Sequence, residues 1–233
     1  MRVYYDLHIH SALSPCADED MTPNNIVNMS LLKGLDVIAV TDHNSCGNLR
    51  AVLEVAGDRL LVIPGMEVET AEEAHILCYF PTVEQAEAMW GLLREHQLPV
   101  KNKPEIFGRQ LYMNAEDEVV GEEEVLLVTA SALTAEEVFF HTRALGGVPV
   151  PAHIDRNSYS VLSNLGFLPP ELHAEAVEIT GKNLALWEKD WREYTVISNS
   201  DAHYLGDIAE AVNFISIKNK NVQEILDNLT VKK

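Results

Sequence analysis

Residues 2–10 read RVYYDLHIH and combine a β-strand pattern with a pair of histidines. The apolar and aromatic residues from Arg2 to Leu7 predict a strand. Side chains two positions apart in a strand point to the same side, so we expect His8 and His10 to project together from its carboxyl end. Two imidazoles placed in this way can hold one metal ion. The alternative interpretation is an ordinary polar pair at the end of a strand.

Further strand patterns alternate with longer helical patterns along the chain. A hydroxyl cap followed by proline, Thr22-Pro23, predicts the start of one helix, and Thr134 with Glu137 forms a capping box for another. This alternation predicts an α/β fold with a parallel sheet in a single domain, 1–233. The expected strands are 2–7, 35–40, 60–63, 75–80, 148–152, 176–179, 196–198 and 212–215, and two further helices are expected at 48–55 and 83–96.

The segment 98–130 departs from this alternation, because it is charged and irregular, with a hairpin expected at 111–120. We interpret it as an insertion in the domain. It is either a solvated excursion or a lid that brings Lys101, Lys103 or Arg109 near a substrate.

The charge balance limits the classes of partner. The 233 residues contain 17 basic and 36 acidic side chains, a formal net charge of −19. This argues against long nucleic acid and against anionic membranes as partners, whereas a small phosphorylated substrate stays compatible if divalent cations reverse the local potential. Three cysteines without a C-x-x-C pair, and a start without a leader pattern, favour a cytoplasmic protein. The oligomeric state is not predicted.

More histidines and carboxylates follow the later strand patterns. In an α/β barrel, functional side chains from several strands converge at the carboxyl-terminal mouth. Glu67 could bridge two cations there, whereas His75 is an exception because it precedes its apolar run. His96, His141 and His173 are expected to be surface or packing residues. The candidates at strand ends are Thr41-Asp42-His43, Gly65-Met66-Glu67, His153 and Asp201-Ala202-His203.

Taken together, the motifs H-x-H, T-D-H, G-x-E, the later lone histidine and D-A-H resemble those of the polymerase and histidinol phosphatase (PHP) family. The resemblance implies a distorted (β/α)7 TIM-like barrel and a trinuclear metal site. Two or three divalent ions are expected, and the mixed ligand set suits zinc, manganese or iron better than magnesium. The ligands implied by the resemblance are His8, His10, His43, Glu67, His75, His153, Asp201 and His203.

A ninth ligand is harder to assign. Family members usually carry S-D-G shortly after H-x-H, but here Ser14 is followed by Pro-Cys-Ala-Asp. Counting back from the T-P helix start selects Asp18, with Asp20 and the soft ligand Cys16 as alternatives. Asp42 is expected to orient an imidazole by accepting its N–H.

These features predict a hydrolase, a metal-dependent phosphoesterase that cleaves a nucleotide or sugar phosphate with a metal-bound hydroxide. Asp201 or His203 would support the leaving group. Arg156 and Lys182, the latter beside Asn183, are expected to bind the substrate phosphate. Alternatively, Arg156 faces solvent or pairs with an acid such as Asp155, and Lys182 is an ordinary surface lysine, which is the commoner outcome for this residue type.

Three other functions remain open at this point. One is a nuclease or phosphodiesterase that acts on short oligonucleotides. Another is a non-catalytic, metal-binding regulatory module. The third is an amidohydrolase, because related enzymes use a similar ligand set for carbon–nitrogen bonds.

Overall fold

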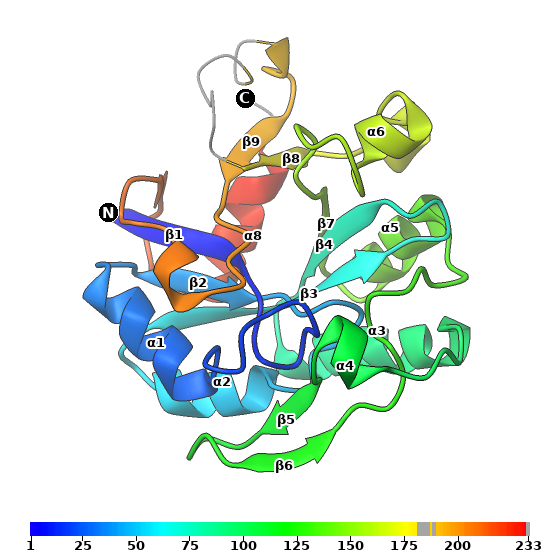
Figure 1. Cartoon of the computed structure of the whole chain (residues 1–233). Coiled ribbons are helices and arrows are strands. Elements are labelled where there is room, and N and C mark those ends of the chain that lie inside the picture. The colour runs from blue at the N-terminus through cyan, green and yellow to red at the C-terminus, as the bar shows by residue number, and fades with distance from the viewer. Residues whose placement is uncertain (181–186, 188–189, 232–233) are drawn as a thin grey trace.

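The computed structural model describes residues 1–180, 187 and 190–231 (Figure 1). A curled six-stranded sheet has the order β10-β1-β2-β3-β4-β7, and two further strand pairs, β8-β9 and β5-β6, lie beside it. The predicted α/β class is confirmed. The main strands are β1 (Arg2–Ile9), β2 (Val37–Val40), β3 (Leu61–Glu69), β4 (His75–Tyr79), β7 (Val148–Pro151) and β10 (Phe214–Ser216), and the paired ones are β5 (Leu111–Met113), β6 (Val119–Glu122), β8 (Ala176–Ile179) and β9 (Thr195–Ser198).

The main sheet is mixed, so the expectation of a parallel sheet is wrong for part of it. Strands β1, β2 and β3 are parallel, but β4 is antiparallel to both β3 and β7. The connection 70–74 between β3 and β4 is too short for a crossover helix, and a short connection requires antiparallel neighbours. Strand β10 also pairs antiparallel with β1. A closed seven-stranded barrel is not confirmed.

The helices begin at the capping signals found in the sequence. The Thr22 side chain accepts the N–H of Asn25 at the start of α1, and Thr134 and Glu137 form a reciprocal capping box at the start of α5. Both motifs satisfy backbone donors that a helix leaves unpaired. Among the fully described elements, the helices longer than one turn are α1 (Pro23–Leu32), α2 (Leu49–Ala56), α3 (Val83–His96), α5 (Ala135–Ala144), α6 (Val161–Leu165) and α8 (Val222–Thr230), and α4 (Pro104–Phe107) is a single turn.

Two apolar clusters hold the sheet in place. The larger one packs the sheet against α1, α2, α3 and α5. The other joins inward residues of the sheet, such as Leu7 and Ile63, to Ile225 and Leu229 of α8. Each fully buried side chain of this size contributes roughly 1.5–3 kcal/mol of transfer free energy. In the described part of the chain, no helix combines the length and apolarity that a membrane crossing requires.

The segment 98–130 docks on the loop that follows His10. Its backbone N–H of Leu111 donates to Ala12 O, and the Asn24 amide donates to Ala115 O. At Gly108, which has φ +97°, an added Cβ would lie 2.1 Å from Pro15 O, so glycine permits this close approach. The hairpin expected at 111–120 is formed by β5 and β6.

Candidate metal centre

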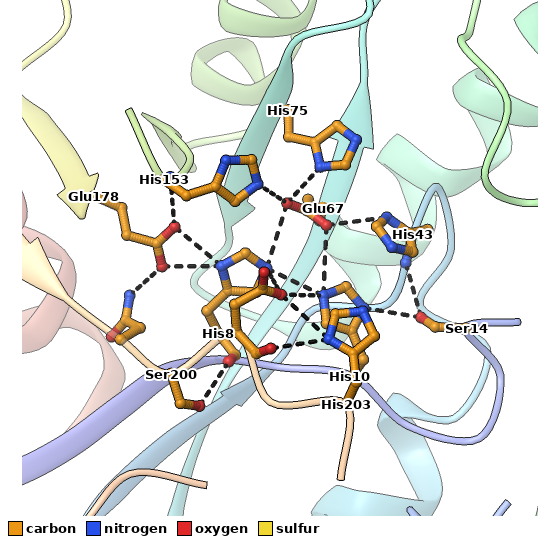
Figure 2. Close-up of polar contacts among 12 residues, drawn as sticks. His8, His10, Ser14, His43, Glu67, His75, His153, Glu178, Ser200 and His203 are labelled. Carbon is orange, nitrogen blue, oxygen red and sulfur yellow. Dashed lines mark hydrogen bonds and ion pairs between the residues drawn. The ribbon is translucent and has the colours of Figure 1, made fainter. Parts of the chain in front are cut away.

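Six histidines and two carboxylates converge around the carboxyl-terminal ends of β1, β2 and β3 (Figure 2). His8 and His10 project together as expected, with ring centroids 5.1 Å apart. All but one of these eight side chains are buried, and His203 is partly exposed. The structure thus brings together every ligand that the resemblance implied except the ninth: His8, His10, His43, Glu67, His75, His153, Asp201 and His203.

Glu67 lies at the middle of the cluster. Its Oε1 is 2.9 Å from His75 Nδ1 and 3.2 Å from His153 Nε2, and its Oε2 is 3.0 Å from His43 Nδ1. Burial raises the pKa of Glu67, but the surrounding imidazoles of His75, His8 and His43 outweigh it and hold the pKa well below its usual range. An anionic carboxylate with both oxygens engaged is suited to bridging cations.

Asp201 closes the opposite side of the cluster. Its Oδ1 lies 3.2 Å from His8 Nε2 and 3.0 Å from His10 Nε2, and these two nitrogens are 3.1 Å apart. Burial raises the pKa of Asp201, but the two imidazoles outweigh it and lower the pKa overall. Asp201 has φ +52° and His153 has φ +28°, so both ligands occupy backbone conformations that most residues avoid.

The reversed direction of β4 explains the exceptional position of His75. In the sequence, His75 precedes its strand, which in a parallel sheet would place it at the wrong end. Because β4 is antiparallel, His75 pairs in register with Glu69 near the carboxyl end of β3. Its imidazole therefore reaches Glu67 at the same edge as the other ligands.

The donor set fits divalent cations. Three groups of side chains each place their ligand atoms within 4.8 Å of one another. Several buried polar atoms have no aligned hydrogen-bond partner, namely His43 Nδ1, Glu67 Oε2, His153 Nδ1 and Asp201 Oδ1, and such atoms are costly unless a ligand engages them. The three groups whose ligand atoms lie this close together are His8–His10–Asp201, His43–Glu67–His75 and His10–His43–His203.

Glu178 supports the cluster and was missed in the sequence. This buried carboxylate accepts hydrogen bonds from His8 Nδ1 at 2.9 Å, from the His153 N–H at 2.8 Å and from the Asn199 amide at 2.7 Å. It orients one imidazole and anchors the backbone of another. The available signal was an acid inside the apolar strand AVEI.

Asp42 acts through serine hydroxyls, so the expectation that it accepts an imidazole N–H is wrong. Its carboxylate accepts from the Ser11 N–H and from the hydroxyls of Ser11 and Ser14. Ser14 Oγ in turn lies 2.9 Å from His10 Nδ1. The aspartate therefore orients His10 indirectly.

The structure does not place Asp18 among the ligands. Its Oδ1 accepts the backbone N–H of Asp20 at 2.9 Å, in a local turn, and Asp20 itself is exposed. Cys16, in contrast, lines the cavity together with His43 and His203. Burial raises the pKa of its thiol, but these two imidazoles outweigh it and lower the pKa to about 6. Of the three alternatives for the ninth ligand, the cysteine is the one that lines the cavity beside the cluster.

Arg156 reaches the site, with Nη1 2.5 Å from Asp201 Oδ2 and a side chain that is 43% exposed. The expected alternative partner Asp155 instead accepts the N–H and hydroxyl of Thr180. The second expected phosphate ligand, Lys182, lies with Asn183 outside the described residues.

A cavity of about 390 Å³ opens onto the cluster. The segment 98–130 contributes Phe107 and Val128 to its wall, whereas Arg109 pairs with Glu122 and Glu19. The described lining does not include the basic residues proposed for a lid. The Tyr159 ring stacks on His75 with centroids 5.2 Å apart. Glu69 also lines the cavity, and burial raises its pKa to about 7.

A curled α/β sheet with clustered imidazoles and carboxylates at its strand ends defines a candidate metalloprotein with a multinuclear centre. The model of the PHP domain family matches residues 6–138, which is more than half of the chain. The chain belongs to the PHP domain family.

Two curated proteins resemble short parts of the chain. An uncharacterized protein from Methanocaldococcus jannaschii is 31% identical over 91 residues, which are 39% of this chain and 11% of that protein. The 5′-3′ exoribonuclease Rnm from Salmonella typhimurium is 34% identical over 76 residues, 31% of this chain and 25% of that protein. The chain therefore matches only a minor part of each relative.

Solved structures share the fold at low sequence identity. A lesion-specific endonuclease from Pyrococcus furiosus has a TM-score of 0.76 and 21% identity, covering 99% of this chain and 56% of that chain. An endonuclease Q complex with a 27-mer duplex containing an abasic lesion has a TM-score of 0.72 and 22% identity, and the match covers 97% of this chain and 56% of that chain. A Bifidobacterium adolescentis chain, provisionally described as a metal-dependent phosphoesterase, has a TM-score of 0.64 and 19% identity, and the match covers 96% of each chain.

Proposed function

We propose that this protein is a metal-dependent phosphoesterase that hydrolyses a small phosphomonoester. The observation that carries the proposal is the buried Glu67 carboxylate among five imidazoles, with Asp201 opposite and the Arg156 guanidinium beside the opening. A centre that combines bridging carboxylates and imidazoles with a cationic group at its rim matches the charge of a phosphate ester.

Different parts of the site would carry out different steps of such a reaction. Divalent cations held by this set would lower the pKa of water and neutralise phosphoryl oxygens. Arg156 is half-exposed and can exchange part of its contact with Asp201 for a bidentate contact with phosphate. The cavity beside the cluster would accept the rest of a small ester.

His203 is our candidate for supporting the leaving oxygen. Burial lowers the pKa of His203, but the neighbouring Cys16 and Asp201 outweigh it and raise the pKa. Its Nδ1 donates to the backbone carbonyl of Asp201 at 2.9 Å, which fixes the ring. An imidazole nitrogen that binds a metal carries no proton. His203 would therefore act as the general acid when its second ring nitrogen is free, and as a ligand it would support the leaving oxygen through the bound cation.

A nuclease is the second candidate. Phe107 and Tyr159 line the cavity and are 41% and 50% exposed, so each offers a ring on which a base could stack. The expectation that the chain does not act on long nucleic acid is not confirmed, because a chain of the same fold is described with a 27-mer duplex. The net charge of −19 still favours a small ester.

The test is hydrolysis of p-nitrophenyl phosphate by the Mn²⁺-loaded and the Zn²⁺-loaded protein, with and without chelator. We expect chelator-sensitive release of phosphate, with a loss of at least about 100-fold in kcat for Asp201→Asn. Arg156→Ala should mainly raise KM, because it removes phosphate binding. The matched control is Arg59→Ala, since Arg59 contacts the end of α2 through Val55 O.

A second assay separates the two candidates. A 5′-phosphorylated single strand and a duplex with an abasic site are incubated with the loaded protein, and the products are resolved by length. Shortened or nicked strands without free phosphate would favour the nuclease. A metal-loaded protein that is inert on every substrate would contradict both candidates.

A further inference from the structure

One of the three donor groups lacks an anion. The groups centred on Asp201 and on Glu67 each contain a carboxylate, whereas His10, His43 and His203 contribute only imidazoles. A divalent ion held by three neutral imidazoles alone would keep its full charge in a largely buried setting, which favours an additional anionic ligand.

Cys16 lies beside this group. Its side chain lines the same cavity as the imidazoles of both His43 and His203. The backbone holds it there through two contacts, because Ala17 N–H donates to Ser14 O and Asp18 N–H donates to His203 O, both at 2.9 Å. The close approach of Gly108 to Pro15 O fixes the same turn from the insertion.

The carboxylates of the same loop point elsewhere. Asp18 uses its Oδ1 to accept the backbone N–H of Asp20, and the described lining of the cavity includes neither aspartate. Asp20 is exposed, and its backbone carbonyl accepts the side-chain amide of Asn25. The sulfur is therefore the anionic donor that this loop presents to the three imidazoles.

We propose that Cys16 is a metal ligand that completes the His10–His43–His203 group. On binding, the thiol releases its proton to solvent and the sulfur donates an electron pair to the metal. The inference rests on the metal centre of the proposed function. A thiolate makes this one position prefer zinc or another thiophilic ion over manganese or magnesium, so the three positions differ in selectivity.

The experiment is Co²⁺ loading of the metal-free protein, followed by absorption spectroscopy in the near ultraviolet. A cobalt–thiolate bond produces a sulfur-to-metal charge-transfer band that imidazole and carboxylate ligands do not produce. We expect the band in the native protein, its loss in Cys16→Ser and Cys16→Ala, and a drop of at least about tenfold in the affinity of one metal position. Cys16 is exposed, so neither variant disturbs the core.

Two variants serve as matched controls. Cys46→Ala removes a thiol that is buried away from the described cavity lining, and Asp18→Asn removes the competing carboxylate; both should retain the band. A native protein that binds cobalt without the band, with unchanged affinity in Cys16→Ala, would overturn the inference and leave the proposed function intact. A protein that binds no metal would overturn both, and retention of the band in Cys16→Ser with its loss in Cys46→Ala would assign the sulfur elsewhere.

Discussion

At the scale of single residues, the ligands depend on neighbours that hold them in one orientation. Glu178 accepts from His8 Nδ1 and from the backbone of His153, so one carboxylate positions two ligands. Ser14, held by Asp42, plays the same part for His10. These contacts fix which ring nitrogen of each histidine faces the centre.

Replacing Glu178 with glutamine should weaken metal binding without unfolding the protein. The amide keeps the shape but loses the negative charge that stabilises the N–H of His8, so we expect affinity to fall roughly 10–100-fold. Competition with a chromogenic chelator measures the change. Glu171→Gln is the control, because Glu171 is exposed outside the cluster. Unchanged affinity in Glu178→Gln would show that the contact does not tune the ligand.

At the scale of elements, strand direction decides which side chains meet. The reversed β4 places His75 at the ligand edge, and α5 then leads into β7, which carries the chain to His153. Helix α5 begins with the capping box of Thr134 and Glu137, and its buried face includes Val138 and Phe139. The cap therefore supports the helix that packs against β4, which begins with His75, and against β7, which precedes His153.

Removal of this cap should cost stability but not metal affinity. Thr134→Ala loses the acceptor for the Glu137 N–H and should lower the free energy of unfolding by about 1 kcal/mol. Urea denaturation followed by circular dichroism measures it. The neighbouring Glu136→Gln serves as a control, since Glu136 is exposed. An equal loss in both variants would argue against the capping contribution.

At the scale of the whole molecule, the cluster joins distant parts of the chain. Its ligands extend from His8 to His203, so ions bound there would cross-link β1, β2, β3, β4 and the segments after β7 and β9. Without cations, buried carboxylates and imidazoles must satisfy one another, and several of their atoms lack aligned partners. Metal binding and folding stability are therefore expected to be linked.

Metal removal should lower the thermal stability of the whole domain. A ligand at about 100 times its Kd adds about 2.7 kcal/mol per site, which for a chain of this length corresponds to roughly 5–11 °C in Tm. Calorimetry with and without chelator measures the shift. His8→Ala should show a smaller chelator effect than the native protein. Identical Tm values for the native protein in both conditions would contradict the linkage.

The sequence predicted the elements because their signals are local. Strand and helix patterns, the caps at Thr22 and Thr134, and the period-two pair His8 and His10 depend on neighbouring residues only. The family motifs added the remaining ligands of the cluster, and the structure brings all eight together. What the sequence by itself determined is thus the α/β class and the side chains that make up the candidate metal centre.

The tertiary structure decided the features that depend on contacts between distant segments. The direction of β4 follows from a short connection whose consequence is seen only once the strands pair. The role of Glu178 depends on β8 bringing this carboxylate to His8. Cys16 rather than Asp18 lines the cavity with the imidazoles, because the segment 98–130 and His203 hold its loop. Spacing along the chain does not encode such packing, since many loop conformations fit the same spacing.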